Sequence, residues 1–185
     1  HSPNMSAVIE KIIKATFDPQ HVSIFQGDSS VAEYLTNMPF DHIFFTGSPA
    51  VGKHVMGAAA KNLASVTLEL GGKSPVIIHE SANLIKAADS IVFSKFLNNG
   101  QTCIAPDYLM VHESIYYTFL DKLRISVSNQ FGDEDGFINN KDYGRLVTKA
   151  HFQRIKDLLD DSINSGASIA VGGKTDSDNK FISPT

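Results

Sequence analysis

Short apolar segments alternate with longer amphipathic segments along almost the whole chain, and this alternation is what most restricts its fold. The apolar segments predict strands at 22–25, 42–46, 66–70, 75–79, 108–111 and 168–171. Helices are expected at 3–17, 29–36, 49–63, 83–97, 114–129 and 148–164. Strands that alternate with helices favour right-handed βαβ units around a parallel sheet, so we predict an α/β fold.

Two local patterns add detail to this prediction. The segment His42–Thr46 shows little polar alternation, which is typical of a strand covered on both faces. The pair Gly71-Gly72 separates two strand segments and predicts a hinge between two lobes.

The composition is that of a globular protein, because 42% of the residues are hydrophobic and 19% are charged. A net charge of −4, without a cluster of Lys and Arg, argues against nucleic-acid binding. No apolar segment approaches the roughly 20 residues that span a bilayer, and His1–Asn4 does not open a signal peptide. The single cysteine, Cys103, fits a reducing compartment, so we expect a cytoplasmic protein or a piece of one.

The segment Gly47–Lys53 matches the first seven positions of the phosphate-binding loop of nucleotide hydrolases, but the eighth is His54 instead of Ser or Thr. Pro49 also removes a backbone N–H from such a loop. A second interpretation fits better, since Ser48 is an N-cap residue and Pro49 a preferred first helical residue after a strand. That helix N-terminus would suit a pyrophosphate, although many capped helices bind nothing.

Two further residues stand out by their chemistry. Cys103 lies in a polar segment between a helix and a strand, where a thiol is either a reactive loop group or a buried, inert side chain. Glu69 stands in an otherwise uncharged strand that leads into two glycines. It is a solvent-facing residue, a general base at a lobe junction or a ribose-binding acid, and the residues alone leave these roles open. The seven histidines follow no zinc-binding spacing, so we expect no metal site.

Three segments, in this order along the chain, resemble the aldehyde dehydrogenase superfamily: Phe45–Ser48 with Gly52, Leu68–Pro75, and Gly100–Tyr108. The spacing from Glu69 to Cys103 is also that of the family, and the similarity continues to Thr185. The run Ala105–Tyr108 is most similar to the class 3 branch, which includes fatty-aldehyde and coniferyl-aldehyde dehydrogenases.

The resemblance implies parts of two α/β lobes, a Rossmann-like NAD(P)-binding domain at 1–70 and part of the catalytic domain at 71–185. It implies oxidation of aldehydes to carboxylic acids, in which Cys103 forms a thiohemiacetal and then a thioester and Glu69 is the base for thioester hydrolysis. The residues implied to contact NAD or NADP are Gly47, Ser48, Val51, Gly52 and the backbone of Leu70.

The family's chain is far longer, so the resemblance implies that an oxyanion-stabilising Asn and the residues that hold the ribose lie outside 1–185. We therefore expect this chain alone to bind cofactor poorly and to oxidise aldehydes slowly or not at all, and the parent enzyme to be a homodimer or homotetramer. Two other functions stay open, a cofactor-independent cysteine acyl hydrolase and a folded module without activity. The sequence identifies neither the aldehyde nor the choice between NAD and NADP.

Overall fold

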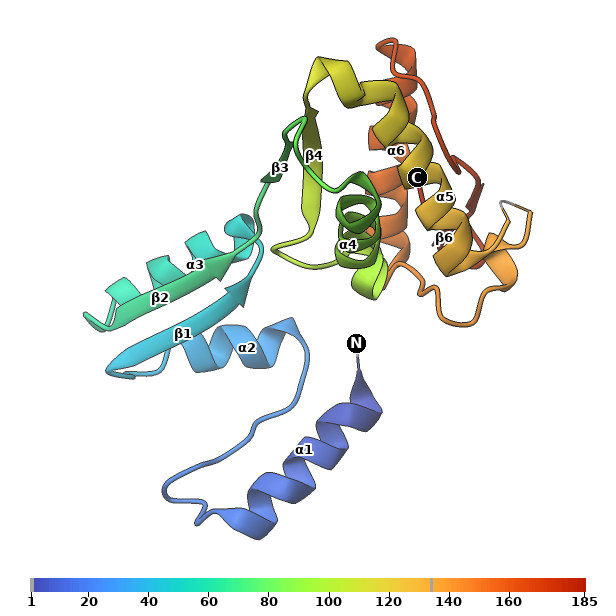
Figure 1. Ribbon diagram of the computed structural model, residues 1–185. Coiled ribbons are helices and arrows are strands. Elements are labelled where there is room, and N and C mark those ends of the chain that lie inside the picture. Colours follow the sequence, from blue (N-terminus) through green and yellow to red (C-terminus); the bar gives the residue numbers. More distant parts are fainter. Residues whose placement is uncertain (1, 134) are drawn as a thin grey trace. The chain divides into compact units, whose positions relative to one another are not determined.

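The computed structural model describes residues 2–133 and 135–185, and the chain divides between Gly71 and Gly72 into two compact units (Figure 1). The first unit holds α1 (Pro3–Thr16), α2 (Ser29–Thr36), β1 (His42–Gly47), α3 (Pro49–Ala60) and β2 (Ser65–Leu70). The second holds β3 (Ser74–Ile78), α4 (Leu84–Phe96), β4 (Pro106–Val111), α5 (Tyr116–Phe131), α6 (Lys149–Asn164), β5 (Thr175–Asp176) and β6 (Phe181–Ile182). Three short 3₁₀ helices in the second unit are η1 (Leu97–Gly100), η2 (Glu113–Ile115) and η3 (Phe137–Asn139).

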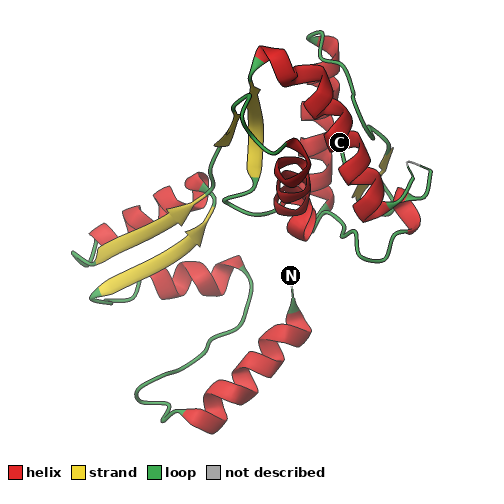
Figure 2. Ribbon diagram, in the orientation of Figure 1, coloured by secondary structure: helices red, strands yellow, loops and turns green. Residues whose placement is uncertain are grey.

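The described strands form three pairs, which Figure 2 shows in yellow. The strands β1 and β2 are parallel, β3 and β4 are parallel, and β5 and β6 are antiparallel. One helix joins the two strands of each parallel pair, α3 in the first unit and α4 in the second. Each unit is therefore built on a βαβ element, and the predicted α/β class is confirmed.

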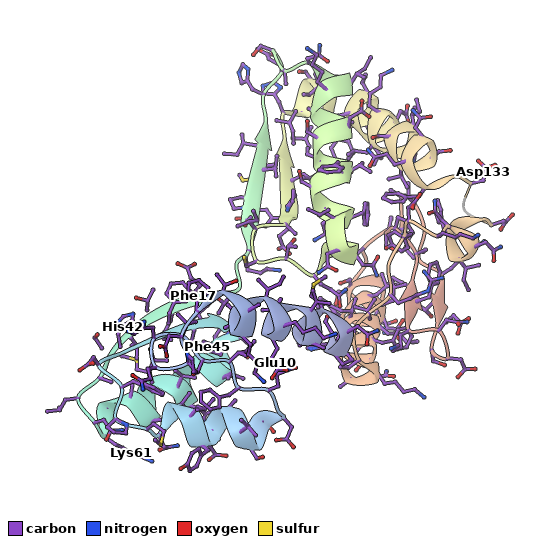
Figure 3. All side chains as sticks on the ribbon, turned by 90° about the horizontal axis from the view of Figure 1, so that it is seen from below. Glu10, Phe17, His42, Phe45, Lys61 and Asp133 are labelled. Carbon is purple, nitrogen blue, oxygen red and sulfur yellow. The ribbon has the colours of Figure 1, made fainter. Side chains whose placement is uncertain are left out.

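In the first unit, α3 packs along β1 and β2, and His42 ties the two strands together. Its Nδ1 lies 2.7 Å from Ser65 Oγ and its Nε2 lies 3.1 Å from Thr67 Oγ1; His42 is labelled in Figure 3. These contacts fix the register in which Thr46 faces Glu69 and Gly47 faces Leu70.

The expectation that both faces of β1 are covered is wrong. Along β1, exposed residues alternate with half-buried ones, and Phe44 is 65% exposed. Ile43 and Phe45 are half-buried on the other face, in register with Val66 and Leu68 of β2. A strand side chain is buried only where another element packs on its face, and α3 packs on one face only.

In the second unit, α4 and α5 pack against each other and enclose the core. Phe119 of α5 is 1% exposed and packs with Ile78 of β3 and Ala88 of α4. Ser126 of α5 is also buried, and its hydroxyl donates to Asp89 Oδ1 of α4 at 2.7 Å. The helix pair is thus held by apolar contact and by a satisfied buried polar group.

The strands predicted at 22–25 and 168–171 are not formed, and both segments are irregular. A strand requires a neighbour that completes its hydrogen-bond ladder, and no described strand pairs with either segment. The predicted helix at 49–63 ends earlier, at Ala60, and Leu63 takes a left-handed backbone conformation with φ 56°.

Tyr143 belongs to the core of the second unit, where its hydroxyl donates to the carbonyl oxygen of Ile182 at 3.0 Å. Burial raises the pKa of Tyr143 well above its usual range. In the unfolded chain a tyrosine ionises near pH ~10, so the folded state holds this proton more tightly. The raised pKa therefore stabilises the folded state. This contribution is fully present below pH ~10 and is lost as the pH rises above that value.

We therefore expect the free energy of unfolding to fall above about pH 10, by up to about 1.4 kcal/mol per pH unit from Tyr143. Tyr143→Phe removes the ionisable hydroxyl and should flatten the alkaline limb of the profile. Urea unfolding of both proteins across the alkaline range measures the difference. Identical pH profiles for the two proteins would contradict this prediction.

Candidate active site

The predicted cofactor segment lies at the turn from β1 to α3. The backbone N–H of Val51 donates to Ser48 Oγ at 3.3 Å, and the N–H of Gly52 donates to the Ser48 carbonyl at 2.9 Å. Pro49 is the first helical residue. The predicted cap is therefore present, and the N-terminus of α3 carries partial positive charge of the kind that attracts anions.

Gly52 lies where α3 packs on β2. A Cβ on this residue would lie 3.0 Å from Cδ2 of Leu70, at the end of β2. Gly47 ends β1 directly beside Leu70. The five predicted cofactor residues are therefore gathered around the carboxyl ends of two parallel strands, which is where ligands bind in open α/β sheets.

A groove of about 620 Å³ lies between α2 and α3 in this unit. Val51 and His54 line it from the first turns of α3, and Glu33 lines it from α2. Phe45 and Lys61, labelled in Figure 3, belong to the same lining. Its volume falls within the range of small-molecule sites, and Val51 of the first turn of α3 is part of its lining. Sequence reasoning missed this groove, because it depends on how α2 packs on α3.

Glu69 lies on β2 opposite Thr46, and its side chain is exposed. Within residues 2–133 and 135–185, no hydrogen bond or ion pair holds its carboxylate. This carboxylate is therefore free to change rotamer and to accept a proton from a water molecule.

Cys103 belongs to the second unit, and its side chain is exposed. The thiol is therefore not buried, whereas its reactivity stays a prediction. Three successive residues before it have left-handed backbones, Asn98 (φ 50°), Asn99 (φ 59°) and Gly100 (φ 74°). Asn and Gly tolerate this conformation better than other residues, which explains why this run ends the preceding helix and turns the chain toward Cys103.

The backbone of the cysteine loop is tightly packed. A Cβ on Gly72 would lie 2.9 Å from the carbonyl oxygen of Cys103, so any side chain at position 72 would displace the backbone of the thiol-bearing residue. The next residue, Lys73, forms an ion pair of 2.5 Å with Asp107. The chain after the glycine pair and the chain after Cys103 are therefore held side by side.

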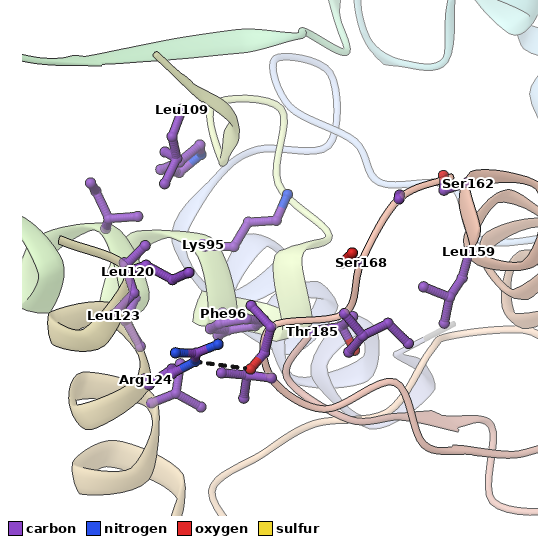
Figure 4. Close-up of a pocket in the computed structure, with 18 of the residues that line it drawn as sticks. Lys95, Phe96, Leu109, Leu120, Leu123, Arg124, Leu159, Ser162, Ser168 and Thr185 are labelled. Carbon is purple, nitrogen blue, oxygen red and sulfur yellow. Dashed lines mark hydrogen bonds between the residues drawn. The ribbon is translucent and has the colours of Figure 1, made fainter. Parts of the chain in front are cut away.

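An apolar pocket of about 330 Å³ lies elsewhere in the second unit, between α4, α5 and residues 162–171 (Figure 4). Arg124 Nε donates to the Ala170 carbonyl beside it at 3.2 Å. Cys103 does not line this pocket. Phe96 and Pro106, which flank the cysteine loop in the sequence, do line it.

Two absences apply to residues 2–133 and 135–185. No cluster of three or more His, Cys, Asp or Glu side chains that could hold a metal ion occurs there. None of the helices in this part combines the length and the apolar character required to cross a membrane.

The first unit carries a capped helix at the carboxyl ends of two parallel strands and the second carries an exposed thiol on a constrained loop, and the two βαβ elements define an α/β protein. The sequence profile of the aldehyde dehydrogenase family matches residues 1–185. The chain belongs to the aldehyde dehydrogenase family.

Individual relatives agree with this assignment. AldX of Bacillus subtilis is 48% identical over 98% of this chain, and the 4,4'-diaponeurosporen-aldehyde dehydrogenase of Staphylococcus aureus is 42% identical over 100%. The dimeric NADP-preferring aldehyde dehydrogenase of Rattus norvegicus is 39% identical over 100%. A member of aldehyde dehydrogenase family 3 is also among the matches, as the sequence predicted. The chain spans between 39% and 41% of the length of these relatives.

Solved structures show the same fold. The substrate-bound state of Staphylococcus aureus AldH matches with a TM-score of 0.85 and 41% identity, covering 99% of this chain and 39% of that one. PnpE in complex with nicotinamide adenine dinucleotide matches with a TM-score of 0.82 and 26% identity, covering 96% of this chain and 38% of that one.

Proposed function

We propose that this chain supplies the nucleophile and part of the cofactor site of an NAD(P)-dependent aldehyde dehydrogenase. The observation that carries the proposal is the exposed Cys103 thiol at the end of a left-handed turn. Membership of the family and the NAD-bound and NADP-preferring relatives support it. The unit that ends at Gly71 would be the cofactor-binding domain and the unit from Gly72 onward part of the catalytic domain.

The thiolate of Cys103 would attack the aldehyde carbon, forming a C–S bond while the carbonyl electron pair moves to oxygen. Bound NAD or NADP would accept the hydride that turns this thiohemiacetal into a thioester. Backbone N–H groups are suitable donors for the developing oxyanion, and the packing of Gly72 on Cys103 fixes the backbone that carries one of them.

Glu69 would act after the oxidation. Its carboxylate would take a proton from water while the water oxygen attacks the thioester carbon. The C–S bond then breaks, which releases the carboxylic acid and restores the Cys103 thiolate. A carboxylate without a fixed partner suits this task, because an ion pair would hold it away from the water.

The cofactor would be held by the first unit. The first turn of α3, with Gly47, Ser48, Val51 and Gly52, would bind the pyrophosphate, and the backbone of Leu70 would contact the nicotinamide amide. The groove between α2 and α3 would take the adenosine half. A homodimer or homotetramer of the parent enzyme and a cytoplasmic location stay predictions, and one relative is itself named as dimeric.

A single-turnover experiment tests the chemistry. The chain is mixed with an aliphatic or an aromatic aldehyde, with and without millimolar NAD or NADP, and the intact protein mass is followed in time. Because this chain alone should bind the cofactor poorly, we expect only slow formation of an acyl adduct on Cys103. This adduct should need the cofactor, and its hydrolysis should be slower by about 10²-fold in Glu69→Gln. Glu113→Gln, which removes an exposed carboxylate of η2, is the control and should hydrolyse the adduct normally.

Two results would overturn parts of the proposal. Turnover of an activated ester without cofactor, together with no oxidation of any aldehyde, would favour the cysteine acyl hydrolase. An adduct that disappears equally fast in Glu69→Gln and in the parent chain would remove Glu69 as the base.

A further inference from the structure

Gln101 joins the cysteine loop to a segment far along the sequence. Its Nε2 donates to the carbonyl oxygen of Arg145 at 3.2 Å, and its Oε1 accepts from the backbone N–H of Val147 at 3.1 Å. These partners lie 44 and 46 residues later in the chain. Both polar atoms of one side chain are therefore bonded to the same distant stretch of backbone.

Gln101 also forms hydrogen bonds within its own loop. Its Nε2 donates to the Asn98 carbonyl at 3.0 Å, and Asn98 Nδ2 donates to the Gln101 carbonyl at 3.2 Å. The side-chain oxygen of Asn99, by contrast, is buried without a hydrogen-bond partner among the described residues. The left-handed turn is thus held through Asn98 and Gln101.

The segment 145–147, whose backbone Gln101 contacts, is itself bonded to the rest of the second unit. The Arg145 guanidinium donates to the carbonyl oxygens of Ile138 at 2.6 Å and Tyr143 at 2.8 Å, and its carbon lies 4.8 Å from the ring centroid of Phe181. Leu146 donates its backbone N–H to the Lys180 carbonyl at 3.0 Å. A loop tied to this segment is therefore tied to the core around β6.

We propose that Gln101 is a positioning residue for Cys103, which it precedes by two places, and that its bonds to residues 145–147 hold the thiol in its reactive orientation. This inference rests on the proposed function, because it assigns a task to Cys103. It does not make Gln101 a catalytic residue, since its polar atoms are directed to backbone groups. A displacement of about 1 Å at a reacting group lowers rates by as much as about 10²-fold, so such a clamp has a measurable effect.

The test compares two reactions of the single thiol. Acylation by p-nitrophenyl acetate forms a C–S bond and releases nitrophenolate, and its rate depends on how the thiol is oriented. Alkylation by iodoacetamide requires mainly that the thiol is exposed. In Gln101→Met, which keeps the length of the side chain but loses its hydrogen bonds, we expect acylation to slow about 10-fold and alkylation to stay within about 2-fold.

A matched control is available in the same unit. Gln130 Nε2 donates to Ser126 Oγ within α5 at 3.3 Å and to the Asp89 carbonyl of α4 at 3.4 Å, so Gln130→Met also removes one local side-chain bond and one between elements. It does not touch the cysteine loop, and we expect both rates to stay at the parent value. Hydrogen exchange of the Val147 amide should accelerate in Gln101→Met and remain unchanged in Gln130→Met.

The outcomes distinguish the positioning role of Gln101 from the nucleophilic role of Cys103. Parent-like acylation in Gln101→Met, or unchanged exchange at Val147 and in residues 102–105, would overturn the positioning role. A parent chain that p-nitrophenyl acetate does not acylate would count against Cys103 as the nucleophile. Hydrogen exchange would then still decide whether Gln101 holds the loop.

Discussion

Replacement of Cys103 by serine is expected to abolish acylation by p-nitrophenyl acetate and cofactor-dependent adduct formation with aldehydes. A serine hydroxyl is almost wholly protonated near neutral pH, whereas a few per cent of a thiol is ionised and thiolate is intrinsically more nucleophilic. Removal of a catalytic nucleophile costs at least about 10³-fold in other enzymes, and we expect a loss of that order. Nitrophenolate release and intact protein mass measure the two reactions.

The structure indicates how this result is to be controlled. Cys103 is exposed, so the serine variant should keep the circular dichroism and urea midpoint of the parent chain. Thr102→Ser alters the preceding residue of the same loop, retains the thiol and should react at close to the parent rate. Rapid acylation of Cys103→Ser would place the nucleophile at another residue and would contradict the proposed function.

Replacement of Phe119 by alanine should give the largest loss of stability in the second unit. Its ring is 1% exposed and lies between β3, α4 and α5, so truncation leaves a cavity where these three elements meet. Deletion of a buried aromatic ring costs about 3–5 kcal/mol. Urea unfolding followed by circular dichroism, with hydrogen exchange of the α4 and α5 amides, measures this loss.

Phe93→Ala is the matched control, because it makes the same chemical change on α4 at a side chain that is 61% exposed. Its effect should stay within about 0.5 kcal/mol. Equal destabilisation by the two substitutions would mean that the core of this unit is not built around Phe119.

Local signals in the sequence were sufficient for most helices and for the turns beside the site. Ser48 caps α3 through the Val51 N–H, and Asn83 caps α4 by accepting from the Lys86 N–H at 3.1 Å. The helix α4 ends at Phe96, just before the run Asn98-Asn99-Gly100, whose three residues are left-handed. Each of these features depends on residues within about three positions of one another, so their types alone predict them.

Strand prediction failed where pairing decided the result. The apolar segments at 22–25 and 168–171 have strand-like composition, but no described strand completes their ladders. Phe44 was expected to be covered and is mostly exposed, because α3 packs on the opposite face. Apolar composition gives a tendency to form a strand, whereas the partner supplies the hydrogen bonds.

In the candidate site, too, some features follow from local sequence patterns and others depend on tertiary packing. Local patterns singled out Cys103, Glu69 and the capped turn, and the family comparison agrees with the enzyme class that the resemblance implied. The sequence did not predict the hydrogen bonds of Gln101 to residues 145–147, nor the groove between α2 and α3. The sequence determined which chemical groups are present and how each short segment turns. Tertiary structure alone decided which distant backbone groups meet them, because contacts across more than 40 residues depend on packing that no local pattern encodes.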